Sequence, residues 1–413
     1  MSFPELTDHA ALGFDAGRLA RIDRFLAERY VTPGKLPGIQ ILVARDGCPV
    51  HFGQAGVMRA DGTAMRADAL MRIASMTKPV TSVAFMQLVE QARVALDDPI
   101  GEVLPELASL GVYAGGGGAV PFAPATPAPP IRFIDLLTHM SGLTYGLQNR
   151  TSIDAAYRAI EFDFAREHHS SDEYLAKLAR MPLEFAPGAG WNYSVATDVL
   201  GIAVERLSGL RLGDYFRRYI FDPLGMRDTG FDVPGDGAER MADAWAYQPG
   251  GAPKPIDRGA DSKLLGPARF HSGGGGLIGT IADYHRFAAM LLGRGTLDGA
   301  RILAPKTIDL MTRNFLPGGA DLASISRSLF SESTSAGSGF GLGFAMVIDP
   351  ARTLMPASRG EFYWGGAYST AFFVDPTEGV TMVFMTQLYP SSAYPVRRQL
   401  KTLIYAALMD SRV

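Results

Sequence analysis

The sequence predicts an α+β protein in which one antiparallel sheet is built from both chain ends and flanked by helices, with a mostly helical region inserted between them. Two observations lead to this fold class. Runs rich in β-branched and aromatic residues, split by Gly, Pro and Asp, occur at 38–57 and again after about residue 270. Between them, most segments carry apolar residues at three- and four-residue spacing, which is typical of helices.

The first elements follow from local signals. Asp15 is expected to cap a helix that buries Leu19 and Ile22 on one face. Two β runs then surround Asp46-Gly47, a residue pair typical of a tight hairpin turn. We therefore expect a strand pair close to the N-terminus, followed by an apolar helix.

The rest of the chain is expected to contribute helices first and strands later. Residues 114–130 consist almost entirely of Gly, Ala and Pro, so we expect a long loop there, either a lid or a solvent loop. Helical spacing covers 131–146, 170–181, 195–209 and 212–226. β runs cover 340–349, 361–366, 369–375 and 379–388, and a last helix is expected around 393–409. These patterns predict a discontinuous sheet domain, 1–105 with 270–413, and a mostly helical domain, 106–269.

Composition excludes several functional classes. The net charge is −3, and no basic run with interleaved aromatic residues occurs, so no nucleic-acid partner is expected. A single cysteine, Cys48, excludes an internal disulfide and a cysteine-rich metal site. The pair His168-His169 does not indicate a metal either, because adjacent residues on a helix point apart and no other ligands accompany them.

The sequence also favours a particular location. The N-terminus lacks the basic stretch and apolar core of a secretory signal. No apolar run approaches the length of about 18 residues that a membrane span needs. We therefore expect a cytoplasmic protein without a membrane partner.

Ser75 and Lys78 are the strongest candidates for chemistry. They lie three residues apart where an apolar helical pattern begins, and Lys78 is the only charged residue between Arg72 and Glu90. Residues i and i+3 share a helix face, so a lysine whose charged form is disfavoured by burial can take the serine proton. N–H groups at the helix N-terminus suit a developing oxyanion. The alternative is a solvated lysine beside a capping serine, and the apolar surroundings argue against it.

Two further stretches can complete such a site. Tyr193 lies in a Gly- and Pro-rich loop before a predicted helix, where its phenol can reach a cleft and move a proton. Gly365 and Gly366 open a strand-like segment, where a ligand can approach the backbone closely and an N–H can complete an oxyanion hole. Taken alone, a ring-packing tyrosine and a simple turn are the simpler explanations of these features.

Taken together, these stretches resemble the serine β-lactamase and penicillin-binding superfamily, which has the Ser-x-x-Lys signature. The similarity is greatest to class C β-lactamases and to family VIII carboxylesterases. It runs over most of the chain, through the segments SMTK, LLTHMSGL, PGAGWNYS, GGGGLIGT and WGG.

The resemblance implies both a fold and a set of roles. The fold would be β-lactamase-like. Ser75 would be the acylated nucleophile, Lys78 its partner in proton transfer, and Tyr193 the base and acid for the hydroxyl and the leaving group. The backbone N–H groups of Ser75 and Ala367 would form the oxyanion hole.

The chain departs from the β-lactamase pattern at two positions. Val195 stands where the Tyr-x-Asn element has asparagine, and Trp364 stands where Lys-Thr-Gly has lysine, followed by Gly365-Gly366. These residues offer no charge to a carboxylate, but they offer surface to an acyl or alkoxy group. All four are therefore predicted to bind substrate, and uncharged esters are favoured over β-lactams.

The sequence thus predicts a serine carboxylesterase that hydrolyses short- to medium-chain esters of small molecules through an acyl-enzyme on Ser75, without a cofactor. Its rivals are an acyltransferase on the same fold, similar to the statin side-chain acyltransferases, and a β-lactamase with weak cephalosporin hydrolysis. A non-catalytic binding module is the remaining alternative. An α/β-hydrolase is excluded because no Gly-x-Ser-x-Gly occurs. Ser141 is interpreted as a turn residue and His139 as a structural hydrogen-bonding group.

Overall fold

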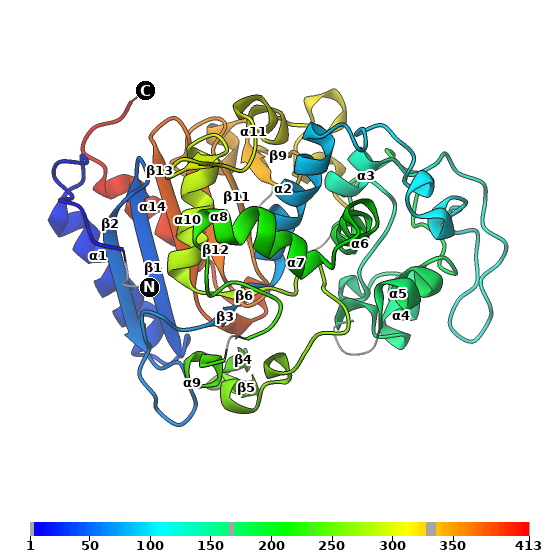
Figure 1. Cartoon of the computed structure of the whole chain (residues 1–413). Coiled ribbons are helices and arrows are strands. Elements are labelled where there is room, and N and C mark those ends of the chain that lie inside the picture. Colours follow the sequence, from blue (N-terminus) through cyan, green and yellow to red (C-terminus); the bar gives the residue numbers. More distant parts are fainter. Residues whose placement is uncertain (1–3, 165–168, 234, 328–335, 413) are drawn as a thin grey trace.

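A seven-stranded antiparallel sheet forms the centre of the molecule (Figure 1). The structure is a computed structural model that describes residues 4–164, 169–233, 235–327 and 336–412. The strand order is β2-β1-β13-β12-β11-β10-β9, so strands from the two chain ends pair through β1 and β13. The strands are β1 Gly38–Arg45, β2 Cys48–Gly56, β9 Ser338–Phe340, β10 Ala345–Val347, β11 Phe362–Gly365, β12 Ala371–Asp375 and β13 Val380–Met385. The predicted fold class is confirmed.

The N-terminal hairpin forms as the sequence predicts. Asp46 and Gly47 both have positive φ, 51° and 80°, which is the conformation that a two-residue turn between twisted strands requires. A helix, α1 (Ala16–Leu26), precedes the hairpin, and the Asp15 carboxylate accepts the N–H of Arg18 at 2.7 Å as its cap. Local sequence therefore determines how the chain enters the sheet.

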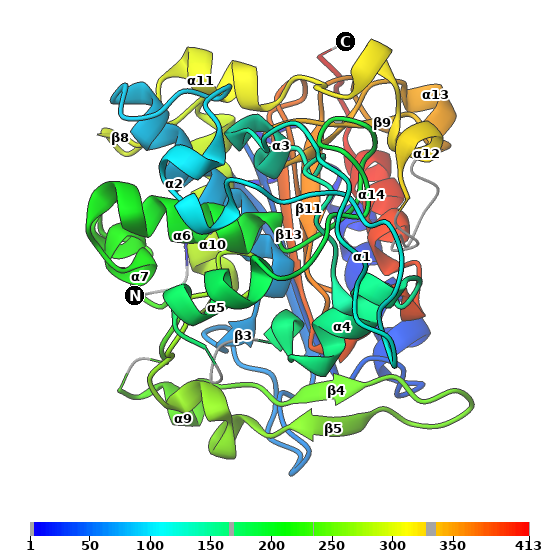
Figure 2. The same ribbon diagram turned by 90° about the vertical axis from the view of Figure 1, so that its right-hand side faces the viewer.

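Helices cover both faces of the sheet (Figure 2). One face packs against α1 and α14 (Val396–Ala407), and the other against α2 (Thr77–Glu90) and α10 (Ile281–Leu292). Adjacent strand residues alternate between these layers: Ile41 belongs to the α1/α14 core, and Leu42 belongs to the α2/α10 core. Every strand buried on both faces thus joins two hydrophobic cores.

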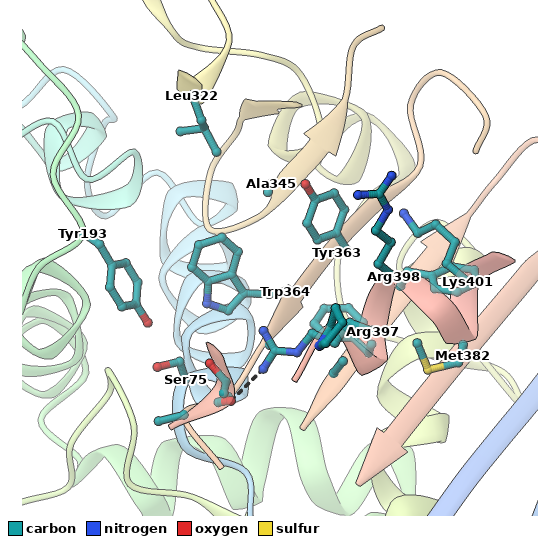
Figure 3. Close-up of a pocket in the computed structure, with 18 of the residues that line it drawn as sticks. Ser75, Tyr193, Leu322, Ala345, Tyr363, Trp364, Met382, Arg397, Arg398 and Lys401 are labelled. Carbon is teal, nitrogen blue, oxygen red and sulfur yellow. Dashed lines mark hydrogen bonds between the residues drawn. The ribbon is translucent and has the colours of Figure 1, made fainter. Parts of the chain in front are cut away.

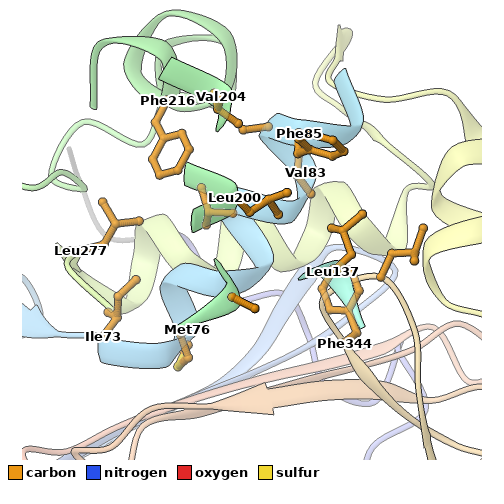
Figure 4. Close-up of a cluster of buried hydrophobic side chains, with 14 of the residues drawn as sticks. Ile73, Met76, Val83, Phe85, Leu137, Leu200, Val204, Phe216, Leu277 and Phe344 are labelled. Atoms are coloured by element: carbon orange, nitrogen blue, oxygen red, sulfur yellow. The ribbon is translucent and has the colours of Figure 1, made fainter. Parts of the chain in front are cut away.

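The inserted region lies beside the sheet and packs on α2 (Figures 1 and 4). Its helices are α3 Phe133–Leu137, α4 Ser152–Ala159, α5 Ser171–Leu178, α6 Ala196–Ser208, α7 Leu212–Phe216, α8 Asp222–Leu224 and α9 Gly237–Arg240. Leu200 and Val204 of α6 meet Val83 and Phe85 of α2 in one buried cluster (Figure 4). The central helix α2 is therefore held between the sheet and α6.

Smaller elements complete the chain. Three short sheets contain β3 Met71–Arg72 with β6 Ile278–Gly279, β7 Thr296–Leu297 with β8 Ala300–Arg301, and β4 Ala244–Ala246 with β5 Lys254–Asp257 and β14 Leu388–Tyr389. The remaining α-helices are α11 Pro305–Met311, α12 Leu322–Ile325 and α13 Pro350–Thr353. Residues 114–130 form no helix or extended strand, as predicted. The two-domain boundaries remain a prediction.

Three expectations were wrong in detail. The segment after residue 270 is not only β, because α10 begins at a Thr280 cap that accepts the N–H of Asp283 at 3.2 Å. The expected run 340–349 is split into β9 and β10, with Gly343 at φ 95° between them. The expected helix at 131–146 ends at Leu137, because His139 adopts a positive φ of 57°.

Phe85→Ala tests whether this core stabilises the fold. The Phe85 ring is fully buried, and its centroid lies 4.9 Å from that of Phe133. Removing it is expected to lower the free energy of unfolding in urea by about 3–5 kcal/mol, because a cavity remains. Val120→Ala, at a site with 63% exposure, should change it by less than about 0.5 kcal/mol. Equal effects of the two substitutions would contradict this account of the core.

Candidate active site

Ser75 sits in a tight turn that leads directly into the central helix. Ala74–Met76 form a 3-10 turn, and α2 begins at Thr77 with Pro79 in its first turn, as the sequence predicts. Ala74 has a positive φ of 46°, and the N–H of Ile73 bonds to the carbonyl of Leu277 at 3.1 Å. A left-handed alanine is a strained conformation that the surrounding contacts must hold. The turn places Ser75 at the wall of a cavity.

The Lys78 side chain is buried and fully engaged. It is 2% exposed, and its Nζ lies 2.6 Å from the carbonyl oxygen of Gly274, 3.1 Å from the Tyr145 hydroxyl and 3.3 Å from Ser75 Oγ. Within the part of the chain that the structure describes, it forms no ion pair with a carboxylate within 4.0 Å. The solvated-lysine alternative is therefore excluded by the structure.

The three contacts of Lys78 match what a proton acceptor needs. An ammonium has three N–H donors, which these three oxygens can receive. A neutral amine has two donors and one lone pair. The Gly274 carbonyl can only accept, so one N–H of the neutral amine must point at it. The contact with Ser75 is the longest of the three, and there the lone pair of the amine can face the Ser75 hydroxyl. The arrangement can therefore take a proton from Ser75 without moving the lysine.

Tyr145 is a site residue that sequence reasoning missed. Its hydroxyl contacts Lys78, and burial, followed by the negative charge of Asp198, raises its pKa well above the usual value. It therefore stays a neutral phenol at physiological pH. The residue was included in a predicted helix, whereas it lies in the loop after α3, and no local pattern distinguishes it from other tyrosines.

Asp198 holds the far side of this cluster. Its carboxylate accepts the Ser272 hydroxyl at 2.5 Å, the N–H of Gly274 at 3.0 Å, and a hydrogen bond from Tyr145. Burial raises its pKa, and the charge of Lys78 acts in the opposite direction. Gly274 is thus held at its N–H by Asp198 and at its carbonyl by Lys78. Local sequence gave no signal for Asp198, which approaches Lys78 only through the packing of α6 on α2.

The aromatic ring of Tyr193 packs against the same lysine. The Nζ of Lys78 is 4.5 Å from the centroid of the Tyr193 ring. The centroids of the Tyr145 and Trp364 rings lie 5.3 and 5.5 Å from that of Tyr193. A cation over an aromatic face is stabilised by the ring's negative surface. The Tyr193 hydroxyl points towards Ser75 (Figure 3). The structure brings Ser75, Lys78 and Tyr193 together, while the catalytic roles assigned to them remain predictions.

The cavity beside Ser75 has a volume of about 170 Å³. Its wall is formed by strand β11 and the residues after it, so Trp364, Gly365, Gly366 and Ala367 all line it, as do Trp191 and Tyr193 (Figure 3). This volume is close to that of a cavity of about 150 Å³ that holds one benzene molecule. No residue of the loop 114–130 lines it, which disfavours the lid interpretation of that loop.

Val195 lies elsewhere than the sequence suggests. It is fully buried at the start of α6, its N–H bonds to the carbonyl of Thr144 at 3.1 Å, and it is absent from the cavity wall. Val195 and Trp364 offer no charge, as the sequence predicts, but other parts of the cavity wall do: Arg397, Arg398 and Lys401 of α14 reach it. Lys401 is paired with the buried Glu361.

Gly366 explains how the strand end approaches the nucleophile. A Cβ at this position would lie 2.3 Å from Thr370 Oγ1 and 2.4 Å from the carbonyl oxygen of Ile73, so only glycine fits. Thr370 Oγ1 in turn contacts the same Ile73 oxygen at 3.3 Å. The segment that carries Ser75 therefore touches the turn that carries Ala367, and both residues line one cavity.

Within the described residues, neither the histidines singled out from the sequence nor a metal site adds to this cluster. His139 is buried, and its Nδ1 lies 3.2 Å from Ser194 Oγ. His169 contacts the carbonyl of Ile160 and Lys177, while His168 lies outside the described residues. Among the residues that the structure describes, no group of three or more His, Cys, Asp or Glu side chains can hold a metal, and no helix is long and apolar enough to cross a membrane.

Known proteins show strong similarity to this chain. The Beta-lactamase family model matches residues 24–406. Esterase EstB of Burkholderia gladioli is 32% identical over 427 residues, 97% of this chain and 98% of that protein. Protein Rv1367c of Mycobacterium tuberculosis is 38% identical over 362 residues, 86% of this chain and 87% of its own.

Solved structures agree. The structure of EstCE1, described as a hydrolase with promiscuous acyltransferase activity, is 25% identical, covers 94% of this chain and 99% of its own, and has a TM-score of 0.77. Simvastatin synthase of Aspergillus terreus, 22% identical with a TM-score of 0.78 over 95% of this chain and 99% of its own, shares the fold. The fold and the site define a protein of the serine β-lactamase type. The chain belongs to the β-lactamase family, which confirms the resemblance stated from the sequence.

Tyr145→Phe tests the cluster around Lys78. The substitution removes only the hydroxyl that links Lys78 to Asp198. We expect kcat for ester hydrolysis to fall about tenfold to hundredfold, because the lysine loses one of its positioning contacts. Tyr157→Phe, at another fully buried tyrosine away from the cavity, should leave kcat unchanged. A Tyr145→Phe enzyme with wild-type kcat would contradict this role.

A pH-dependent stability follows from His139. Burial and then the charge of Lys78 lower its pKa well below 6.5. Below pH 6.5 the unfolded chain therefore binds a proton that the folded chain does not, so stability falls as the pH drops. His139→Asn, which tolerates the positive φ, should abolish about 2 kcal/mol of the stability loss between pH 7 and pH 5.

The measurement is the free energy of unfolding in urea at both pH values. His9→Asn, at a side chain that is 40% exposed, is the matched control. An identical pH dependence in wild type and His139→Asn would show that His139 is not the titrating group.

Proposed function

We propose that this chain is a serine esterase that hydrolyses small carboxylic esters through an acyl-enzyme on Ser75. The observation that carries the proposal is the distance of 3.3 Å between Ser75 Oγ and the Nζ of a buried lysine, at the wall of a largely aromatic cavity. The relative named Esterase EstB supports this choice of reaction. No step requires a cofactor or a metal.

The first half of the reaction transfers the acyl group to the serine. As Ser75 Oγ attacks the ester carbonyl, its proton passes to the Lys78 amine, with the Tyr193 hydroxyl assisting. The backbone N–H groups of Ser75 and Ala367 receive the oxyanion of the tetrahedral intermediate. The proton is then returned to the leaving alkoxide, and the alcohol departs.

The second half releases the acid. Water takes the place of the alcohol and gives a proton to the pair of Lys78 and Tyr193 as its oxygen attacks the acyl carbonyl. The same N–H groups stabilise the second oxyanion. When it collapses, the proton returns to Ser75 Oγ and the carboxylic acid leaves. Lys78 and Tyr193 act as one coupled unit, so the role of general base is assigned to the pair and not to either residue alone.

Acyl transfer to an alcohol is the second candidate. EstCE1 has promiscuous acyltransferase activity in addition to hydrolysis, and a Monacolin J acid methylbutanoyltransferase of Aspergillus terreus is 27% identical over 383 residues. The aromatic wall of Trp191, Tyr193 and Trp364 favours an apolar acceptor over water at the same position. Product ester formed with an added alcohol would favour this alternative.

The cytoplasmic location stays an expectation from the sequence.

The proposal is tested with p-nitrophenyl esters from acetate to dodecanoate. We expect the highest kcat/KM with short chains, because a cavity of about 170 Å³ holds a benzene-sized group and not a dodecanoyl chain. Ser75→Ala should reduce kcat at least about 10⁴-fold, since no acyl-enzyme can form. The exposed Ser109 provides the control, and Ser109→Ala should retain full activity. Wild-type turnover by Ser75→Ala would refute the proposed function.

A further inference from the structure

The turn that follows β11 is held by an arginine of α14. Gly366 N–H bonds to the Thr370 carbonyl at 2.9 Å, and Ser369 N–H bonds to the Gly366 carbonyl at 3.0 Å. The Nη2 of Arg397 then reaches both carbonyl oxygens, that of Gly366 at 2.7 Å and that of Thr370 at 2.8 Å (Figure 3). One guanidinium thus joins the two ends of the turn.

The chain leaves room for this guanidinium at one glycine. A Cβ on Gly365 would lie 2.5 Å from the Cζ of Arg397. Any side chain there would therefore displace the guanidinium from the turn. The two glycines are required for different reasons. Gly365 leaves space for the guanidinium of Arg397, and Gly366 leaves space for Thr370 Oγ1 and the carbonyl oxygen of Ile73.

The peptide between Gly366 and Ala367 transmits this contact to the cavity. In a planar trans peptide the C=O and N–H bonds point in opposite directions. A donor that fixes the Gly366 oxygen therefore fixes the direction of the Ala367 N–H as well. A hydrogen bond from a cation also polarises the peptide and makes its N–H a stronger donor.

The neighbouring cations of α14 do not share this arrangement. Arg398 is exposed and donates to the carbonyl of Leu354 at 3.2 Å. Lys401 is paired with Glu361. Among the described residues, Arg397 is the cation that hydrogen-bonds to the 366–370 turn.

We propose that Arg397 is a positioning residue of the oxyanion hole, which orients and polarises the Ala367 N–H through the Gly366 carbonyl. The proposal rests on the proposed esterase, because it assigns a task within the same reaction. In this role Arg397 acts through the peptide and not on the reacting atoms themselves. Its contribution appears in the transition state, when negative charge develops on the carbonyl oxygen, and not in the binding of the neutral ester.

Arg397→Met tests this role because methionine keeps an apolar stem and removes the donors. Arg18→Met is the matched control, because this exposed arginine donates to the carbonyl of Ala406 in the same helix at 2.9 Å and does not line the cavity. The readouts are kcat and KM for the preferred p-nitrophenyl ester, together with the inhibition constant of an alkylboronic acid. The boronic acid forms a tetrahedral adduct in which Ser75 Oγ bonds to boron and one boron oxygen occupies the oxyanion position.

For Arg397→Met we expect kcat to fall about tenfold to hundredfold with KM within about threefold, because one oxyanion donor is misdirected and not removed. The inhibition constant of the boronic acid should rise by a similar factor. Arg397→Lys should lose less than Arg397→Met, since it keeps a cationic donor, and it serves as the test variant if the methionine variant does not fold. Arg18→Met should match wild type.

With the proposed function intact, two results would overturn the role. One is a wild-type kcat in Arg397→Met while Ser75→Ala is inactive, which rejects Arg397 and leaves the esterase intact. The other is a raised KM with unchanged kcat, confined to esters that carry a carboxylate, which would make Arg397 a substrate-binding group. An active Ser75→Ala would reject the proposed function, and the role of Arg397 with it.

Discussion

The whole site depends on how Lys78 is buried. An amine-bearing side chain that is 2% exposed must have every hydrogen-bonding direction filled, because an unpartnered buried polar group is costly. Gly274 and Tyr145 fill two of these directions, and Ser75 occupies the third. Asp198 in turn holds both Gly274 and Tyr145. The lysine is thus fixed by groups that stay in place when a proton moves between it and the serine.

The fold brings two distant parts of the chain to this lysine. The N-terminal part supplies Ser75 in the 3-10 turn that leads into α2, and the C-terminal part supplies β11 and its turn. The two meet where Thr370 contacts the Ile73 carbonyl. The sheet joins them because β1 pairs with β13, so the cavity lies where the two chain ends are packed together. Helix α14 supports the turn through Arg397, which lines the same cavity as Ser75.

The sequence predicted the parts of the site that local spacing encodes. Ser75 and Lys78 share one helix turn, so their proximity follows from the helix itself. Tyr145, Asp198 and Arg397 could not be found in this way, because they come from three separate segments and meet the site only through packing. Val195 follows Tyr193 closely in sequence but points into the core, since the chain enters α6 there. The sheet was predictable from runs of β-branched and aromatic residues split by Gly, Pro and Asp, whereas α10 was missed because its apolar residues were interpreted as part of the β-rich end.

The most direct test of the central claim is labelling with a fluorophosphonate, followed by peptide mapping and measurement of the labelling rate in wild type and Lys78→Met. The account predicts a single label on Ser75 and a large fall in the labelling rate of Lys78→Met, because the serine loses its proton acceptor. A label on another residue, or a Lys78→Met enzyme that is labelled at the wild-type rate, would contradict the account.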